Sequence, residues 1–376
     1  MSNKNKVLIY GAGVIGSIYA VKFANAGHEV SVYARGSRLQ SLESKGLLYA
    51  EKTTIKTVPV TVLSNVDHTT IYDYVFVAVR YEQIEAALTE LAENNNPNIV
   101  TMVNNPKGYT HWENLIGKGR LIPAFPGAGG KIEDDILHYA LTPKIIQTTT
   151  FGEVDGTVTD RLRNLAQLFK SSQIPHSVSK NMDAWQKSHL ALVIPLANGI
   201  YYDGGNTYTT AKNKKAIRMM SITLKDNFNA LKTKGIPITP AKLNLFCFCP
   251  LWLMQICLKI FCNTKLAETV SSHVPYIKEE MAMLDKEFTE ITHTRSFDYS
   301  SEGYKYIGNG CKATGADEGW KMSSELFFKC IDCGYFMNGD PNKDDICHCG
   351  KLSKDTGFGR FGSVYGDDAI EVYIRI

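Results

Sequence analysis

The chain has 376 residues and a formal net charge of +3, from 41 Lys and Arg against 38 Asp and Glu. This charge is too small and too dispersed to favour nucleic acid or an acidic membrane as a partner, and the length favours two or three domains. Nine cysteines without a recognisable secretory signal indicate thiols or metal ligands rather than a disulfide framework, so we expect a cytoplasmic protein.

The first segment is typical of a dinucleotide-binding turn. An apolar run at 7–10 favours a buried parallel strand, and three glycines with the spacing Gly-x-Gly-x-x-Gly follow it. Such glycines permit the tight turn, the approach of a pyrophosphate and the close packing of the next helix, whereas an incidental glycine turn is the alternative. We expect the phosphates on the free amides at the helix start, held by Gly11, Gly13, Val14, Ile15 and Gly16.

The end of the second predicted strand, at residues 29–33, distinguishes the two nicotinamide cofactors. NAD sites usually carry Asp or Glu there, whereas an arginine suits the 2′-phosphate of NADP. This chain has Arg35, with Ser37 and Arg38 as supplements and no carboxylate. A planar guanidinium can bind a phosphate through two hydrogen bonds. We therefore predict NADP, with solvated loop arginines as the alternative.

Two further buried strands, at 74–79 and 99–103, are predicted to extend the parallel sheet. Ligands of such sheets bind outside the carboxyl ends of the strands. Arg80 and Asn104 follow these two ends and are expected at the ligand, although Asn is also common in turns that bind nothing. The segment 121–130 is predicted as a strand that leads into a glycine-rich loop near the nicotinamide.

From about residue 181 the pattern changes to helices. We predict an α/β domain with a Rossmann-type parallel sheet over 1–180, an all-α domain over 181–294 and a separate module over 295–376. The longest apolar stretch, 245–262, is interrupted by proline, glutamine and lysine. It therefore favours a buried helix or a subunit interface, such as a homodimer through the helical domain, over a membrane span.

Several of these segments occur in an order that is typical of one enzyme family. They are the glycine motif, Arg35-Gly36, Leu42-Glu43-Ser44-Lys45-Gly46-Leu47, Val77-Ala78-Val79-Arg80-Tyr81-Glu82-Gln83, Asn104 and Trp185-Gln186-Lys187. Over about residues 6–294 the chain resembles the ketopantoate reductase (2-dehydropantoate 2-reductase) family. The resemblance implies NADPH, a helical substrate domain, a cleft between the domains, and Lys187 and Asn104 as catalytic residues. An ammonium such as that of Lys187 can protonate a reduced carbonyl oxygen, although a surface lysine is the alternative.

The substrate side departs from the family. The family's catalytic helix carries asparagines four and eight residues beyond the lysine, and here those positions are Ala191 and Pro195. His189 lies about 200° around the helix from Lys187, and we expect it to pack rather than to bind substrate. The sequence thus predicts an NADPH-dependent reductase of an unidentified, 2-oxoacid-like carbonyl substrate. A non-catalytic dinucleotide-binding sensor or scaffold is the alternative.

The C-terminal module carries two pairs of closely spaced cysteines. Two residues separate Cys330 from Cys333 and one separates Cys347 from Cys349, each pair beside a glycine. His348 is an alternative ligand, and Cys311 is a possible substitute. Four thiolates suit a structural, tetrahedral Zn²⁺, and the segment resembles small zinc ribbons. An incidental cluster or a redox dithiol is the alternative. Mixed charges in the module disfavour nucleic acid.

Overall fold

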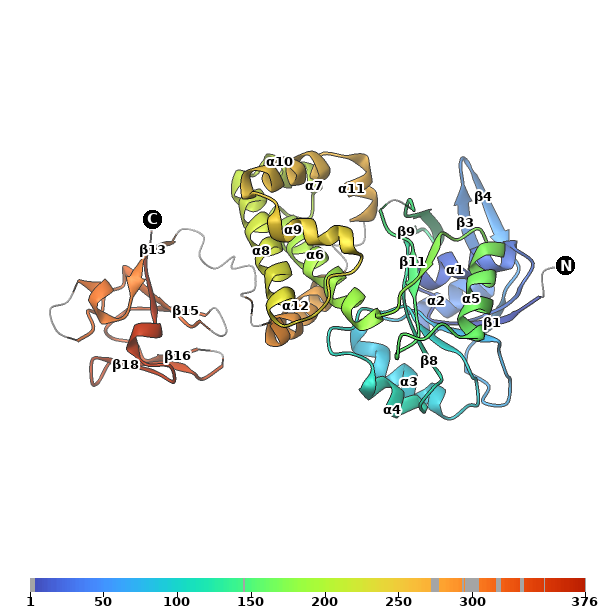
Figure 1. The fold of residues 1–376 in the computed structure, drawn as a ribbon, viewed down its shortest axis with the longest axis horizontal. Helices are drawn as coiled ribbons and strands as arrows, with labels where there is room; N and C mark the ends of the chain where they lie inside the picture. Colours follow the sequence, from blue (N-terminus) through green and yellow to red (C-terminus); the bar gives the residue numbers. More distant parts are fainter. Residues whose placement is uncertain are drawn as a thin grey trace. The chain divides into compact units, whose positions relative to one another are not determined.

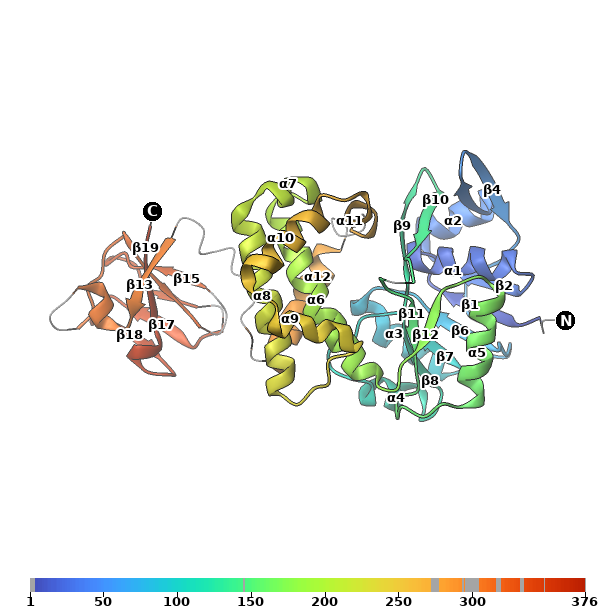
Figure 2. The same cartoon turned by 45° about the horizontal axis from the view of Figure 1, so that its top comes forward.

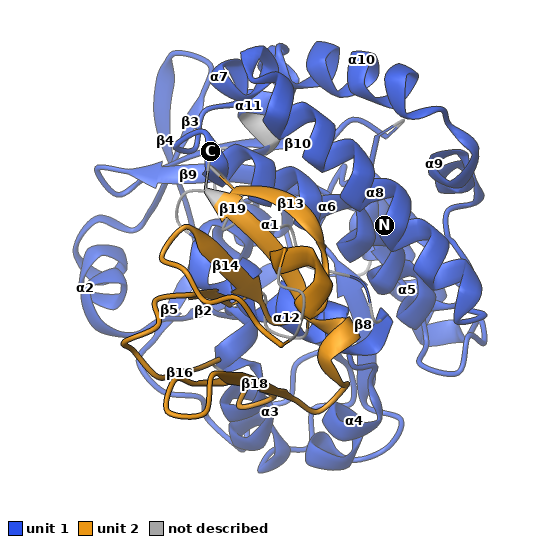
Figure 3. Ribbon diagram, turned by 90° about the vertical axis from the view of Figure 1, so that its left-hand side faces the viewer, with its two compact units in different colours: residues 1–294 blue, residues 295–376 orange. Residues whose placement is uncertain are grey.

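The computed structural model of the chain describes residues 4–144, 146–271, 277–292, 294, 304–315, 319–331, 335–347 and 349–375. The chain divides into two compact units, residues 1–294 and 295–376 (Figure 3). A further division of the first unit at residue 180 stays a prediction.

The first unit is built on an eight-stranded sheet with the order β12-β11-β8-β7-β6-β1-β2-β5. The strands from β5 to β8 pair in parallel, β11 pairs antiparallel with β8, and β12 is parallel to β11. This confirms the predicted parallel sheet. From β1 the chain continues to β2 and β5 on one side and then to β6 on the other side, and parallel sheets bind ligands at such a switch point. The bounds are β1 Lys6–Tyr10, β2 Glu29–Tyr33, β5 Thr61–Leu63, β6 Tyr74–Val77, β7 Ile99–Thr101, β8 Leu121–Phe125, β11 Thr149–Phe151 and β12 His176–Val178.

Successive side chains of the central strands enter two separate cores. Val7 and Ile9 of β1 pack in the cluster that contains α1 and α5, whereas Leu8 and Tyr10 pack with α3 and α4. Burial on both faces explains why β1 is a continuous apolar run. The helices and the 3₁₀ turn of this part are α1 Val14–Asn25, α2 Gly36–Lys45, η1 Tyr81–Gln83, α3 Ile84–Ala92, α4 Thr110–Ile116 and α5 Asp160–Ser171.

A second sheet, with the order β4-β3-β10-β9, contacts α1 through β9 and β10. It corrects the prediction of a glycine-rich loop over 121–130, because β8 ends at Phe125 and β9 begins at Ala128. Gly130 gives the reason: a Cβ there would overlap the carbonyl oxygen of His138 in the paired strand. The glycine thus serves the close approach of two strands. The bounds are β3 Leu47–Glu51, β4 Thr54–Val58, β9 Ala128–Glu133 and β10 Ile136–Leu141.

Beyond residue 181 the described part of the first unit is helical, as predicted, and its helices pack around α6 and α8 (Figures 1 and 2). None of the helices in the described ranges is long and apolar enough to cross a bilayer. Their bounds are α6 Met182–Tyr202, α7 Thr207–Lys212, α8 Lys214–Thr233, η2 Ala241–Asn244, α9 Leu245–Phe248, α10 Leu251–Cys262, α11 Lys265–Val270 and α12 Lys278–Thr292.

The second unit contains two small antiparallel sheets, with the orders β13-β19-β14-β15 and β16-β17-β18. One cluster of nine buried residues forms its core: Leu326, Phe328, Cys330, Met337, Cys347, Leu352, Phe361, Ile370 and Val372. The bounds are β13 Tyr304–Asn309, η4 Cys311–Thr314, β14 Leu326–Lys329, β15 Phe336–Asn338, β16 Asp345–Ile346, β17 Leu352–Asp355, β18 Arg360–Ser363, η5 Asp367–Ala369 and β19 Glu371–Arg375.

Candidate dinucleotide and reductase site

The three glycines between β1 and α1 differ in what surrounds them. A Cβ at Gly11, where φ is +108°, would lie 2.5 Å from the carbonyl oxygen of Ala78, and a Cβ at Gly16 would overlap the carbonyl oxygen of Gly11. Both positions therefore exclude a side chain because of the protein's own backbone. A Cβ at Gly13 would meet no atom within 4 Å. Packing thus does not explain Gly13, whereas the approach of a ligand to its backbone would.

The amides at the start of α1 are suited to bind an anion. No side chain caps the helix at Gly13, and the first bond within the helix runs from the Ser17 amide to the Gly13 carbonyl, at 2.9 Å. The amides of Val14, Ile15 and Gly16 precede that bond and have no partner within the helix. Together with the positive end of the helix dipole they form a cradle for phosphate groups.

Arg35 follows β2 and is held by two tyrosines and a carboxylate. Its Nη2 lies 3.2 Å from the Tyr10 hydroxyl and 2.7 Å from Oε2 of Glu90, and its Nε donates to the Tyr33 hydroxyl. The hydrogen bond to Tyr33 raises the pKa of Arg35. The end of β2 itself carries no carboxylate, as the sequence predicts, but α3 places Glu90 beside Arg35. Arg35 is nevertheless 67% exposed and accessible to a ligand.

Arg38, in the first turn of α2, reaches the glycine turn. Its Nε donates to the carbonyl oxygen of Ala12 at 3.1 Å, and its Nη2 donates to Oγ of Ser17 at 3.3 Å. Nη1 is buried and has no hydrogen-bond partner among the described residues, and burial lowers the pKa of Arg38. The sequence predicts only a supplementary role for this arginine, because nothing in its spacing places it on the turn. Its contacts support the backbone that would hold the phosphates.

Asn104 and Asn105 follow β7 and have different roles. The Asn105 side chain makes the turn: its Nδ2 donates to the Gly108 carbonyl at 2.7 Å, and its Oδ1 accepts from the Lys107 amide at 3.0 Å. Turn chemistry therefore explains Asn105 and not Asn104. Oδ1 of Asn104 is buried without a hydrogen-bond partner in the described part of the chain. A buried amide oxygen of this kind is costly unless a ligand or water satisfies it.

The loops after β6 and β7 are joined to α12 by one carboxylate. Glu287 accepts a hydrogen bond from Nζ of Lys107 at 2.6 Å and another from the Tyr81 hydroxyl. Arg80, the predicted cofactor residue of the β6 loop, is 56% exposed and lies 4.0 Å from Glu82. The two strand-end loops are thus joined to α12 of the helical region.

Gln186 positions the start of α6, a role that the sequence did not indicate. Its fully buried side chain donates to the carbonyl oxygen of Val103 at 3.1 Å and to that of Ala124 at 3.4 Å. These carbonyls lie at the carboxyl ends of β7 and β8. Lys187 follows Gln186 in the sequence, and Asn104 follows Val103. The hydrogen bond between Gln186 and Val103 therefore brings Lys187 and Asn104 to the same edge of the sheet.

Lys187 lies in the first two turns of α6 and pairs with Asp183. Its Nζ is 2.7 and 2.6 Å from the two carboxylate oxygens, and its side chain is 13% exposed. An ammonium has three N–H donors, so two bonds to Asp183 leave one for another acceptor. A largely buried, oriented ammonium of this kind can serve as a proton donor.

Three positions of α6 beyond Lys187 pack within the protein. His189 is 9% exposed and stacks on Trp185, with ring centroids 5.2 Å apart, and its ring lies 4.2 Å from that of Phe125. Packing is thus its observed role, as expected. Ala191 and Pro195, in place of the family's asparagines, are buried.

The comparisons with known sequences point to one family of reductases. Residues 7–156 match the family model described as ketopantoate reductase PanE/ApbA. A 2-dehydropantoate 2-reductase from Mesorhizobium japonicum is 33% identical over 136 residues, which are 35% of this chain and 37% of that protein. The sequence match therefore spans little more than a third of this relative.

Solved structures share the fold over a longer part of the chain. The 2-dehydropantoate 2-reductases from Porphyromonas gingivalis and Geobacter metallireducens match with TM-scores of 0.56 and 0.55, each at 14% identity. Each match covers 77% of this chain, with 98% and 99% of the respective structure. A D-mandelate dehydrogenase solved with NADH and anilino(oxo)acetate matches with a TM-score of 0.55 at 12% identity, over 77% of this chain and 98% of that one. At these identities the likeness shows the fold.

Proposed function

We propose that the protein is an NADPH-dependent oxidoreductase that reduces a carbonyl to an alcohol, as the match of residues 7–156 to the ketopantoate reductase family model suggests. The glycine turn carries the proposal. Packing requires Gly11 and Gly16, whereas Gly13 faces open space beside the uncapped amides of α1. A dinucleotide diphosphate fits this combination of open backbone and free N–H groups. Reduced thiols make the cytoplasm the proposed location.

The residues along the carboxyl edge of the sheet divide into two groups in this proposal. The glycine turn, supported by Arg38, binds the diphosphate, and Arg35 binds the 2′-phosphate of NADPH. The second group includes Asn104, which follows β7. Its buried amide oxygen would accept a hydrogen bond from the nicotinamide ribose or from the substrate. When bound, NADPH supplies the hydride, and the protein orients the carbonyl carbon toward it.

Lys187 is the proposed acid. As hydride reaches the carbonyl carbon, negative charge develops on the oxygen, and a nearby ammonium stabilises it and then donates a proton. Asp183 occupies two of the three donors of Lys187 and orients the third. The substrate class is a 2-oxoacid-like carbonyl compound. Ala191 and Pro195 supply no amide for a substrate hydroxyl, so we infer a substrate other than one recognised by such contacts.

A combined binding and turnover experiment tests this proposal. Three proteins are compared: the wild type, Lys187→Met and the control Lys170→Met, at an exposed lysine of α5. For each, NADPH binding is measured by fluorescence, and NADPH consumption is measured with a panel of 2-oxoacids. We expect Lys187→Met to bind NADPH normally and to lose at least about 100-fold in turnover, the range for a general acid. A wild type that binds no nucleotide would refute the reductase. Binding without turnover of any substrate would favour a sensor, and full turnover by Lys187→Met would exclude the acid role.

The helical part of the first unit is also proposed to form a homodimer. Seven large apolar side chains on α9 and α10 are between 37% and 70% exposed: Leu245, Phe248, Leu251, Trp252, Leu253, Ile256 and Ile260. One partner of a standard interface buries about 800 Å², which side chains of this number and size can contribute to. A face of this size is unusual on a monomer. A second copy of the same face would cover it.

Solution mass measures this association directly. Trp252 is 64% exposed, and Ile55, the exposed apolar residue of β4, is 59% exposed. We expect a dimeric wild type, a monomeric Trp252→Glu variant and a dimeric Ile55→Glu control in light scattering coupled to gel filtration. A wild type that is monomeric at micromolar concentration would contradict the interface, and binding of the monomer to lipid vesicles would assign the face to a membrane surface.

A further inference from the structure

Three cysteines of the C-terminal unit meet at the ends of two β-hairpins. Cys330 follows β14, and Cys347 and Cys349 follow β16, with their Sγ atoms all within 4.8 Å of one another. Cys330 and Cys347 are buried, whereas Cys349 is exposed. We propose that these three side chains bind one structural zinc ion as thiolates. This site is independent of the proposed reductase chemistry, which uses residues of the first unit.

The distances between the sulfur atoms suit a shared metal ion. Sγ of Cys349 lies 3.6 Å from Sγ of Cys330 and 3.4 Å from Sγ of Cys347. A disulfide bond would place the two sulfur atoms at about 2.05 Å. Two thiolates on one tetrahedral zinc, each with a Zn–S bond of about 2.3 Å, lie about 3.8 Å apart. The observed spacing is close to the metal-bound value and far from the covalent one.

The backbone around Cys347 is arranged to support a thiolate. The Leu352 amide donates to Sγ of Cys347 at 3.2 Å, and the Gly350 amide donates to the Cys347 carbonyl at 2.9 Å. Gly350, at φ of +73°, makes the tight turn that returns the chain to β17. At the other hairpin the Cys330 amide donates to the Tyr335 carbonyl at 3.0 Å. An N–H group directed at sulfur favours its charged form, as in outer-shell contacts of metal ligands.

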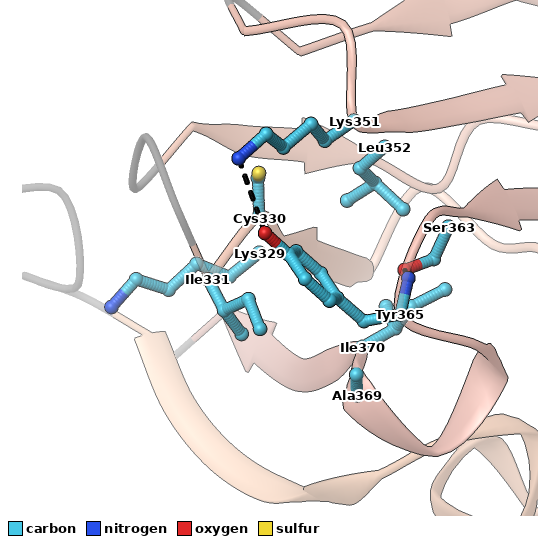
Figure 4. Close-up of a pocket in the computed structure, with 9 residues that line it drawn as sticks. All are labelled: Lys329, Cys330, Ile331, Lys351, Leu352, Ser363, Tyr365, Ala369 and Ile370. Atoms are coloured by element: carbon cyan, nitrogen blue, oxygen red, sulfur yellow. Dashed lines mark hydrogen bonds between the residues drawn. The ribbon is translucent and has the colours of Figure 1, made fainter. Parts of the chain in front are cut away.

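Two lysines, Lys329 and Lys351, line the same small pocket as Cys330 (Figure 4). Nζ of Lys351 donates to the Tyr365 hydroxyl at 3.1 Å, whereas Nζ of Lys329 lies 3.8 Å from Oε2 of Glu371, which balances its charge. Several thiolates on one zinc ion leave a net negative charge at the site, which nearby ammonium groups stabilise. Cys262 of the first unit differs: burial in α10 raises its pKa to about 11, which keeps the thiol protonated, as is typical of core packing.

The size of the unit gives the ion a structural task. Among the described residues of this 82-residue unit, a cluster of nine buried residues, two of them Cys330 and Cys347, forms the core. Small domains with so few apolar residues usually need a metal or a disulfide to fold. A zinc ion at the two hairpin ends would join β14 and β15 to β16 and β17. Cys333, the fourth ligand predicted from the spacing, and His348, its alternative, lie outside the described residues.

Metal analysis of the full chain tests the proposal. The protein is purified without added metal or a polyhistidine tag, and its zinc and iron contents are measured by mass spectrometry. We expect about one zinc per chain in the wild type, a loss of zinc in Cys347→Ser and in Cys349→Ser, and full zinc content in Cys257→Ser, a control at an exposed cysteine of α10. A wild type without zinc, a wild type with iron instead, or variants that keep their zinc would overturn the proposal.

A second measurement does not depend on the folding of the variants. A mercurial reagent that modifies thiols is added to the wild type in the presence of a coloured zinc indicator. We expect about one equivalent of zinc to be released as the thiols react, and cobalt(II) substituted at the site to show a thiolate-to-metal charge-transfer band. Release of zinc by a chelator alone, without cysteine modification and without a thiolate band for cobalt, would assign the metal to other ligands and refute the site.

Discussion

The contact between Arg35 and Glu90 allows a test of whether the protein prefers NADPH or NADH. Substitutions at these two residues are expected to change the affinity for NADPH in opposite directions. Arg35→Ala removes the guanidinium proposed to bind the 2′-phosphate. Glu90→Gln keeps the shape of the acidic partner and removes its charge, which lies 2.7 Å from Arg35. If the phosphate and Glu90 compete for the same guanidinium, the first substitution weakens NADPH binding and the second strengthens it.

The expected magnitudes follow from the exposure of the pair. A hydrogen bond to a charged group contributes about 1.5–3 kcal/mol, which is roughly 10- to 150-fold in Kd. Because Arg35 is 67% exposed, the lower end applies, and we expect Arg35→Ala to weaken NADPH binding about tenfold. An exposed ion pair contributes up to about 1 kcal/mol, so Glu90→Gln should tighten NADPH binding by up to about fivefold. NADH, which lacks the phosphate, should respond much less to either change.

Fluorescence titration with both nucleotides measures these effects. Arg163→Ala is the matched control, because Arg163 is 62% exposed and has its own carboxylate partner, Asp160. An equal loss of NADPH and NADH affinity in Arg35→Ala would refute a phosphate-specific role. Weaker binding of NADH in Glu90→Gln, without any gain for NADPH, would show that the carboxylate binds the ribose hydroxyls and that NADH is the cofactor.

Further substitutions separate packing from ligand binding and test the titrating groups. Gly16→Ala should lower the melting temperature, because the new Cβ overlaps the backbone at Gly11. Gly13→Ala should keep the wild-type melting temperature and lose NADPH affinity. Equal melting temperatures for the two variants would contradict the difference in space around these glycines. Burial raises the pKa of Glu280 from 4.5 to about 7, so its contribution to stability is present below about 4.5 and is lost as the pH rises to about 7. Glu280→Gln should therefore flatten the pH dependence of the melting temperature between about pH 4.5 and 7. An unchanged slope would show that Glu280 does not titrate in this interval. The same effect in the control Glu279→Gln, at the exposed neighbour, would also exclude Glu280 as the titrating group. Cys333→Ser should lower the zinc content of the purified chain, and a wild-type zinc content would show that the spacing misidentified the fourth ligand.

The glycine turn could be predicted because its requirements are local. A buried strand, a turn and a helix follow one another within about 20 residues, and the tight conformation at Gly11 and the close packing at Gly16 depend on that segment and its nearest strand. The same glycine signal misled at Gly130, where the residue permits two strands to approach rather than a loop to remain open. Glycine marks a position without space for a side chain, and only the fold shows what occupies that space.

Contacts between distant segments could not be predicted from one sequence. Glu90 is 55 residues from Arg35 and reaches it only because β6 lies beside β1 in the sheet. Gln186 contacts carbonyls 83 and 62 residues away. The resemblance to a family identified its neighbour Lys187. It assigned no role to Gln186, which positions the start of α6. Arg38 likewise lacked any signal that would place it on the glycine turn.

The face of α6 beyond Lys187 bears on the substrate. Ala191 and Pro195 replace two amides with apolar surface, and both are buried by packing. The next amide along the helix, Asn198, donates to Asp285 of α12 at 2.9 Å, and burial raises the pKa of that carboxyl group. This amide is therefore engaged within the protein, and α6 offers a substrate one oriented ammonium and no free amide at positions 191, 195 and 198.

A substrate that matches this surface has a carbonyl for Lys187 and few hydroxyl groups. The carboxylate of a 2-oxoacid needs a cation, and Arg80, which is 56% exposed at the end of β6, is a suitable one. A hydroxylated side chain would lose its hydrogen bonds to water without gaining amides in return, which costs about 1–3 kcal/mol for each unpaired polar group. We therefore expect 2-oxoacids with apolar side chains to be reduced with higher kcat/KM than hydroxylated ones of the same length. The reverse order would show that polar groups outside α6 form the pocket.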